Sequence, residues 1–165
     1  METEKLFTIA EALLKPWAKE YKRPDENRLD VYLVREDLLE AVEGLAQARW
    51  GYLSAISGVD LVPPAQDGTG ENQEGSLEVL YHFCNSAAVL SLRIEIPYSD
   101  AHVPSVCGII PSATIYEREL MELFGITVVD TPVPDHLVLP DDWPDGVFPL
   151  RKSFTGFDSP QAQES

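Results

Sequence analysis

The hydrophobic pattern predicts three helices, because apolar residues recur every three or four positions in three segments of the chain. The segments are residues 4–22, 36–48 and 113–123. Pro16 lies inside the first of them, where its missing amide proton is expected to break or kink the helix. Gly125 follows the third, in the position where a left-handed glycine commonly ends a helix. The second helix is expected to bury Leu38, Leu39, Val42, Leu45 and Ala46.

Strands are predicted in the middle of the chain, where β-branched and aromatic residues alternate with polar ones. We expect strands at 30–34, 77–83 and 89–96, a turn at 85–88 between the last two, and an extended segment at 50–60. The last strand alternates most regularly. One of its faces carries Leu90, Leu92, Ile94 and Ile96, and the other carries Ser91, Arg93 and Glu95.

The remaining segments are rich in turn-forming residues. Residues 23–27 predict a turn, 62–76 a mobile hairpin-like loop, and 97–104 a polar connection. The order of elements predicts a single-domain α+β fold, in which helices cover one face of a mixed β-sheet. We expect a core domain at 1–125, followed by a long, irregular and proline-rich C-terminal arm at 126–165.

Composition and charge exclude several functions. The chain has 165 residues, 44% of them apolar, and a formal net charge of −16. Such an acidic chain would repel phosphates, so we expect no nucleic-acid partner and no polybasic contact with a membrane. The whole sequence has neither a run of about 18 apolar residues nor a secretory signal, so direct membrane insertion is not expected. An acidic surface favours a basic partner.

Candidate metal and redox residues are few. Cys84 and Cys107 lie in apolar surroundings and are expected to be buried thiols, although a disulfide between them stays open. There is no CxxC motif, and an iron–sulfur cluster needs about four thiolates. His82, His102 and His136 are spaced too widely to match a known ligand pattern. No catalytic, cofactor-binding or metal-binding residue is therefore predicted.

The predicted helix at 114–125 combines an apolar face with dense charge. The apolar face consists of Tyr116, Leu120, Leu123 and Phe124, and the charged residues are Glu117, Arg118, Glu119 and Glu122. Arg118 and Glu122 have the spacing of an ion pair along a helix. Glu119 and Glu122 should repel one another if unpaired, which favours a basic partner. The alternative is a solvated charged face with one local ion pair.

Three elements occur in order within the last third of the chain. They are YERELMELFGI at 116–126, in which Leu120 and Met121 do not belong to the pattern, LPDDW at 139–143 and PLRKSF at 149–154. Together they resemble the thirty-kilodalton subunit of respiratory complex I. That family is also called the C subunit, or the J subunit in cyanobacterial complexes, and it has homologues in energy-converting [NiFe] hydrogenases. The resemblance covers most of the chain, weakly before residue 100.

One segment departs from the family pattern. Respiratory members usually carry a His-Pro-Asp-x-Arg-Arg element between the helix and LPDDW, whereas residues 131–136 of this chain read TPVPDH. Of that element only the proline remains, and both arginines are absent. The departure favours a hydrogenase-type complex over a quinone-reducing one.

The resemblance implies a non-catalytic assembly subunit in the hydrophilic arm of a membrane-associated electron-transfer complex. It implies no cofactor in this chain, because clusters, NiFe or quinone sites belong to partner subunits. The partners would be the large catalytic subunit (the D subunit of complex I or a hydrogenase large-subunit homologue) and neighbouring iron–sulfur subunits, at the cytoplasmic face of the membrane. The residues expected at interfaces are Glu117, Arg118, Glu119, Glu122, Leu123, Phe124, Gly125, Asp141, Trp143, Pro149, Leu150, Arg151 and Lys152.

The C-terminal arm has the composition of an interface. It carries large apolar side chains in a proline-stiffened segment, and proline lowers the entropy lost on docking. These side chains are Trp143, Phe148, Phe154 and Phe157. Arg151 and Lys152 could either contact a partner or fold back onto acids of the same chain, such as Glu117 or Glu119.

Two other functions remain as alternatives. A free-standing acidic protein-interaction module would share the composition but would not need the three C-terminal elements. An autonomous metal-dependent enzyme would have to use the scattered histidines and aspartates, and no spacing among them supports this.

Overall fold

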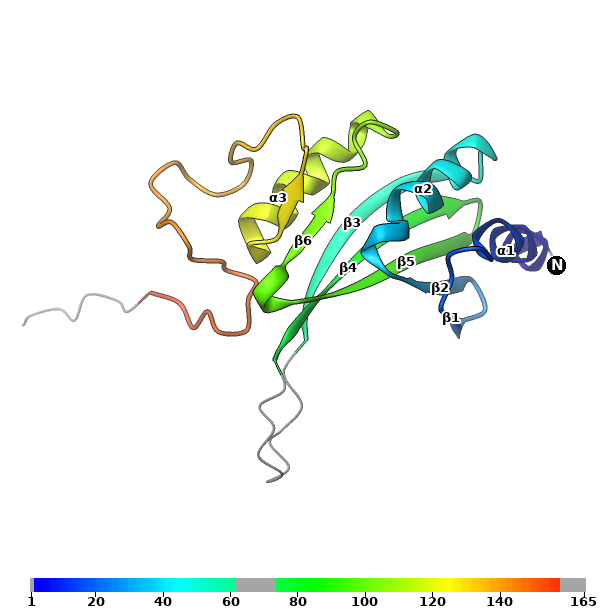
Figure 1. The fold of residues 1–165 in the computed structure, drawn as a ribbon, viewed down its shortest axis with the longest axis horizontal. Helices are drawn as coiled ribbons and strands as arrows, with labels where there is room; N and C mark the ends of the chain where they lie inside the picture. Colours follow the sequence, from blue (N-terminus) through cyan, green and yellow to red (C-terminus); the bar gives the residue numbers. More distant parts are fainter. Residues whose placement is uncertain (1, 62–73, 158–165) are drawn as a thin grey trace, which may run out of the picture.

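A five-stranded mixed sheet forms the framework of the protein (Figure 1). The computed structural model describes residues 2–61 and 74–157. The strands lie in the order β1-β2-β5-β4-β3. Their bounds are β1 Glu20–Asp25, β2 Arg28–Leu33, β3 Tyr52–Leu61, β4 Ser76–Asn85 and β5 Ala88–Pro97. Only the β2–β5 pair is parallel within this sheet, so the predicted mixed sheet is confirmed.

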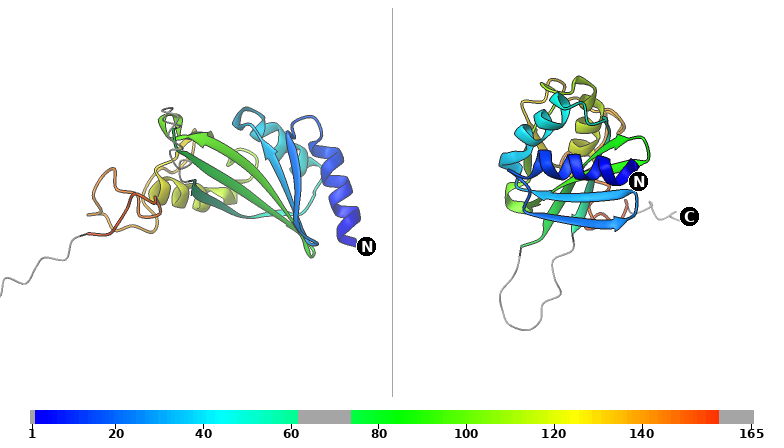
Figure 2. Two further views of the ribbon diagram at one scale, coloured as in Figure 1. Left: turned by 90° about the horizontal axis from the view of Figure 1, so that it is seen from below. Right: turned by 90° about the vertical axis from the view of Figure 1, so that its right-hand side faces the viewer.

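Helices cover one face of the sheet (Figure 2). They are α1 Glu2–Leu14, α2 Leu38–Gln47 and α3 Thr114–Phe124, with short 3₁₀ turns η1 Arg35–Asp37, η2 Tyr98–Asp100 and η3 Pro111–Ala113. The first helix packs on α2 and β5, and α3 lies against β3. A second, parallel pair of short strands joins β6 His102–Pro104 to β7 Thr127–Val129. The α+β class with helices on one side of a mixed sheet is therefore confirmed.

The core lies between the helices and the alternating apolar positions of the strands. Leu90, Leu92, Ile94 and Ile96 of β5 are all fully or almost fully buried, as the alternation predicts. They belong to one core cluster with α1 side chains such as Phe7, and α1 packs on β5. The opposite face of the sheet carries polar side chains, which is typical of a sheet with one face packed and one open.

The first predicted helix is too long. It ends at Leu14, whose carbonyl accepts the amides of Trp17 and Ala18 in a closing turn beside Pro16. Residues 20–25 form β1 instead, and the predicted turn shrinks to residues 26–27. Every residue of β1 is exposed, so no buried alternation marks it in the sequence.

Other predictions hold with changes in detail. The second helix begins at Leu38 after η1, and it buries Ala41 in place of the exposed Leu39 and Ala46. The prediction of an irregular chain after residue 125 is wrong for β7, and that of a polar connection at 97–104 is wrong for β6. Each of these strands has three residues, too few for a periodic pattern. The hairpin-like loop predicted at 62–76 falls largely outside the described residues, and the division at residue 125 stays a prediction.

Candidate protein-docking site

Glu117 of α3 is a buried carboxylate that holds a loop of the same chain. Only 1% of its surface is exposed. It accepts hydrogen bonds from Ser105 Oγ at 2.8 Å and from the amide of Val106 at 2.7 Å, and the Cys107 thiol lies 3.2 Å away. Burial, followed by the nearby carboxylate, raises the pKa of Cys107, so the thiol stays protonated. Glu117 thus fixes the segment that leads from β6 to α3.

Arg118 and Glu122 fasten the C-terminal arm to α3. Arg118 donates from Nε and Nη2 to the carbonyl oxygens of residues 135–136, at 2.8 and 2.6 Å. Glu122 is buried and accepts the next two amides, those of Leu137 and of Val138, the latter at 2.9 Å. Arg118 therefore binds the carbonyl groups of two arm residues, and Glu122 binds the amide groups of the next two. Charged hydrogen bonds of this kind are among the stronger ones in proteins.

This arrangement replaces the ion pair that helical spacing suggests. Among the described residues, Arg118 and Glu122 form no ion pair with each other, because both point to the arm backbone. The alternative of a solvated charged face is wrong for Glu117 and Glu122, which are buried. Glu119 is half-exposed and lies on a different part of the helix surface.

Two glycines allow α3 and the arm to pack closely. Gly125 ends α3 with φ of 69°, as predicted, and a Cβ there would lie 2.3 Å from the Phe148 ring. Gly58 of β3 faces Phe124, whose ring would meet a Cβ at 2.6 Å. Any larger residue at either position would displace an aromatic ring. The arm therefore returns to the end of α3 at a point where only glycine fits.

A second anchor follows at residues 150–152. The Leu150 amide donates to the carbonyl of Leu123 at 3.0 Å, and Arg151 Nε donates to the last carbonyl of α3. The Lys152 amide donates to Asp60 Oδ2 at 2.7 Å. This segment folds back onto its own chain, one of the two alternatives, but its acceptors are Asp60 and carbonyl groups rather than Glu117 or Glu119.

Asp60 and Arg151 meet around one aromatic ring. The Tyr98 hydroxyl donates to the buried carboxylate of Asp60, and the guanidinium of Arg151 lies 5.0 Å from the centre of the Tyr98 ring. Burial, followed by the Asp60 carboxylate, raises the pKa of Tyr98. Sequence reasoning missed Asp60 and Tyr98, since both lie far from the C-terminal elements along the chain.

The rest of the arm carries a cluster of aromatic rings. Trp143, Phe154 and Phe157 contact each other, with ring centres 5.2 to 6.2 Å apart. Trp143 Nε1 donates to the carbonyl of Val147 at 2.8 Å, so its polar atom is satisfied within the arm. Asp141 is exposed. The arm loops away from the sheet beside α3 (Figure 1).

A separate polar network lies on the open face of the sheet. Arg93 donates to Glu78 at 2.6 and 2.9 Å and to Asp30 at 2.6 Å, and both carboxylates are nearly buried. The hydrogen bonds to Glu78 raise the pKa of Arg93 most. His82 lies 2.9 Å from Ser91 Oγ, and burial lowers the pKa of its imidazole. The alternation along β5 predicts Arg93 on this face, whereas the register of the strands decides which side chains it meets.

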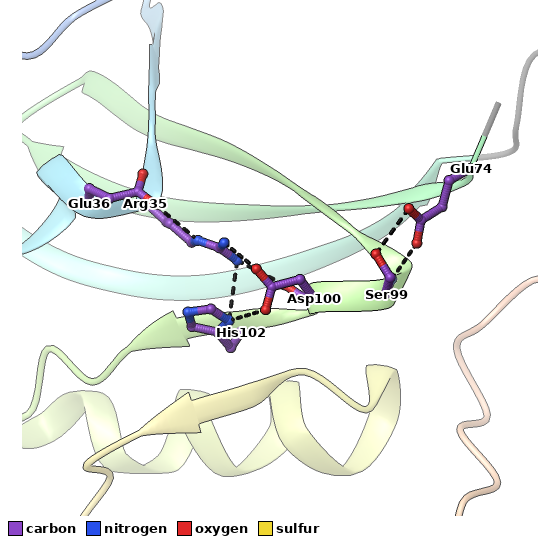
Figure 3. Close-up of polar contacts among 6 residues, drawn as sticks. All are labelled: Arg35, Glu36, Glu74, Ser99, Asp100 and His102. Carbon is purple, nitrogen blue, oxygen red and sulfur yellow. Dashed lines mark hydrogen bonds and ion pairs between the residues drawn. The ribbon is translucent and has the colours of Figure 1, made fainter.

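Another cluster links the start of α2 to the segment before β6. Arg35 donates to the carbonyl of Asp100 at 2.8 Å and pairs with its carboxylate, and His102 Nδ1 lies 2.7 Å from the same carboxylate (Figure 3). The hydrogen bond from Arg35 lowers the pKa of Asp100. Arg35 and His102 thus share the Asp100 carboxylate, and we interpret this cluster as a structural contact between the two segments.

The three C-terminal elements noted in the sequence thus lie together at one end of the molecule (Figure 1). Within residues 2–61 and 74–157, no three His, Cys, Asp or Glu residues are grouped to hold a metal. In the same residues, no helix is long and apolar enough to cross a bilayer. Cys84 and Cys107 are both free, with Cys107 buried and Cys84 half-buried.

A small α+β domain that presents a firmly anchored C-terminal arm is the class of protein that this geometry defines. The chain belongs to the family described as respiratory-chain NADH dehydrogenase, 30 Kd subunit, which matches residues 31–160. The family resemblance seen in the sequence is therefore confirmed. As a member, the chain is a subunit of an NADH dehydrogenase-like or related respiratory membrane complex.

Relatives come from several kinds of complex. The C subunit of the F(420)H(2) dehydrogenase of Methanosarcina mazei is 34% identical over 79% of this chain and 77% of the relative. Formate hydrogenlyase subunit 5 of Escherichia coli is 32% identical over 77% of this chain. The C subunit of the NADH-quinone oxidoreductase of Saccharopolyspora erythraea is 31% identical over 79% of it. The chain spans only 21% and 50% of the lengths of the last two.

Two solved structures share the fold. One is in the membrane-bound sulfane sulfur reductase, an archaeal respiratory membrane complex, with a TM-score of 0.65, 23% identity and coverage of 91% of this chain and 85% of that one. The other is a trypsin-resistant fragment of Nqo5, with a TM-score of 0.56, 24% identity and coverage of 81% and 99%. At this identity, the likeness supports the fold alone.

Proposed function

We propose that this chain is a non-catalytic assembly subunit that packs on the large catalytic subunit of a membrane-associated electron-transfer complex. The contact surface would consist of α3 and the C-terminal arm. The chain itself would carry no redox cofactor, and clusters, NiFe or quinone sites would lie in the large subunit and in neighbouring iron–sulfur subunits. It would sit peripherally at the cytoplasmic face of the membrane, held there by its partners.

The distribution of exposed apolar side chains carries this proposal. Among the described residues, six of the thirteen large apolar side chains that are exposed lie between residues 129 and 157: Val129, Val133, Leu137, Val138, Leu150 and Phe157. Arg118, Glu122 and Asp60 hold this segment in place. An apolar surface that is already ordered loses little entropy when it docks, which is the condition for a stable interface.

The lengths of the relatives support a large-subunit partner. A fifth of formate hydrogenlyase subunit 5 aligns with this chain, and the same holds for the C/D subunit of the NADH-quinone oxidoreductase of Erwinia tasmaniensis. In those proteins the equivalent domain is part of a polypeptide several times longer. Domains that are joined in one chain in some species commonly contact each other as separate chains in others, so the joined remainder is the expected partner.

The type of complex is a separate question. The departure at residues 131–136, where both family arginines are missing, favours a hydrogenase-type complex. In the structure, Arg118 binds the carbonyl groups of the last two residues of this segment, and Glu122 binds the amides of the two residues that follow it. Relatives named for both types match the chain, so the proposal rests on the departure itself.

Co-expression with the large subunit encoded in the same organism tests the proposed function. We expect the full chain to co-purify with the large subunit as a stable complex. A chain truncated after Pro140 should stay folded, because the core lies before it, but should no longer join the complex. Normal incorporation of the truncated chain would contradict the proposal.

Point variants separate docking from folding. Val138→Asp places a carboxylate at an exposed arm residue, and Ile9→Asp places one at a comparably exposed position on α1. Both variants should keep the melting temperature of the parent chain. Only Val138→Asp should weaken co-purification, and equal loss from both would show that the arm is not the docking surface.

A further inference from the structure

The two edges of the main sheet differ in how they are protected. At one edge, β1 has six residues, includes Pro24 and several charged residues, and has an irregular register between Lys22 and Asp25. These features are known to block the addition of another strand. At the other edge, β3 has ten residues, and Asp60 is its one ionisable acidic or basic residue. Among the described residues, β3 forms backbone–backbone hydrogen bonds only with β4, although the Tyr98 hydroxyl donates to the Leu61 carbonyl at its end and α3 packs beside it.

A groove of about 210 Å³ runs along the β3 edge. Its walls include Ile56, Ser57 and Gly58 of β3, together with Glu119 and Leu123 of α3. The Leu150 side chain also lines it and is 51% exposed. Consecutive residues of a strand point to opposite faces of the sheet. Because Ile56 and Ser57 both line the groove, it opens at the edge of the strand rather than over one face.

Glu119 gives this groove a charge. It is half-exposed, and within residues 2–61 and 74–157 its carboxylate has neither a hydrogen bond nor an ion pair. Its neighbours on α3 are both occupied, since Glu117 holds a loop and Glu122 holds the arm. The other groove side chains are mostly apolar. A carboxylate in such surroundings favours a cationic group that brings an apolar stem with it, as lysine and arginine do.

We propose that the edge of β3 accepts an extended segment of the large subunit as an added strand. The segment would place an apolar side chain in the groove and a lysine or arginine against Glu119. Strand addition of this kind supplies affinity through backbone hydrogen bonds and specificity through alternate side chains. The inference deepens the proposed function and rests on it, because it names the shape and charge of the partner's contact.

Charge decides against a second copy of this chain as the occupant. The chain carries a net charge of −16, so two copies would repel each other, and the edge itself offers no basic residue for a second Glu119. An extended segment from a basic region of another protein faces no such repulsion. The partner is therefore expected to differ from this chain.

Hydrogen exchange of the complex with the large subunit tests the added strand. The β3 amides that point away from β4 should exchange at least about tenfold more slowly in the complex than in the free chain. The amides of β1 should not change, because that edge stays exposed. A complex that forms without added protection in β3 would overturn the inference and leave the proposed function intact. Failure to form any complex would overturn both.

Charge reversal tests the contact with Glu119. Glu119→Arg should weaken binding of the large subunit about tenfold or more, while Glu40→Arg, an exposed change on α2, should weaken it less than twofold. Equal affinities for the two variants would overturn the predicted pairing. Protection of β3 in the isolated chain that rises with its concentration would identify a second copy as the occupant and would also overturn the inference.

Discussion

Under α1 and α2, the face of the sheet consists of buried apolar side chains, such as Leu90, Leu92 and Ile94 of β5. Beside α3, by contrast, the arm is fastened by Arg118 and Glu122, which bind its backbone. The first region is held by removal of apolar surface from water, which has no preferred direction. The second is held by hydrogen bonds that work only in one geometry. The stability of the core is therefore spread over many apolar contacts, whereas the arm depends on a few specific atoms.

The difference also separates what each region does for the protein. Loss of a core side chain affects the whole fold, because the interior is closely packed. Loss of an arm contact affects only the position of the arm, which lies at the surface. A partner that docks on the arm thus meets a surface whose order can fail without unfolding the domain. Four predictions sharpen this comparison, in order of expected effect.

The largest effect is expected in the core. Leu92→Ala removes a fully buried side chain and leaves a cavity, so it should lower the free energy of unfolding by about 3 kcal/mol. Urea unfolding followed by circular dichroism measures this value. Leu39→Ala on α2, which is 39% exposed, serves as the control and should cost much less. Similar losses for both would mean that the core is not the main source of stability.

Glu117 lies at the boundary between the two regions, since it is a buried polar group inside the packed domain. Glu117→Ala leaves the Val106 amide and the Ser105 hydroxyl without their acceptor, so we expect a loss of about 2 kcal/mol in the free energy of unfolding. Thermal unfolding of the purified chain checks this. A loss below about 0.5 kcal/mol would show that water replaces the carboxylate.

Arm contacts should fail locally. Glu122→Ala removes the acceptor for the Leu137 and Val138 amides, and we expect these amides to exchange about tenfold faster, which corresponds to about 1.4 kcal/mol. The β5 amides should keep their protection. Glu119→Ala is the matched control on the same helix. If the β5 amides also exchanged faster, the arm and the core would not be held independently of each other.

The smallest effect concerns the open face of the sheet. Burial lowers the pKa of His82, so the unfolded chain binds a proton near pH 6.5 that the folded chain does not yet bind. Stability is therefore complete above that pH and falls as the pH drops through the lowered pKa. Since His82 is only half-buried, solvent screens part of this effect, and the loss should be the smallest of the four. Comparing His82→Asn with the parent chain at pH 7.5 and 5.5 measures it, and identical pH dependence would refute the assignment.

Much of the fold is visible in the sequence because it depends on periodic burial. The alternation in β5 and the helical spacing in α2 predict both elements, and Gly125 predicts the end of α3. By contrast, β1 is exposed along its whole length and shows no alternation. The strands β6 and β7 form only because backbone groups that are distant in the sequence pair with each other, and no local sequence pattern predicts such pairing.

The docking site, too, has features that the sequence predicts and features that only the tertiary structure shows. The sequence by itself predicted three of its elements, since those at 116–126, 139–143 and 149–154 stand in order and resemble one family, but it did not predict Asp60 or Tyr98. Only the tertiary structure decided what they contact. Arg118 and Glu122 could have paired with each other at helical spacing, but the returning arm offers them backbone groups instead. Spacing limits which residues can meet along a helix, whereas the path of a distant segment decides which of those meetings occur.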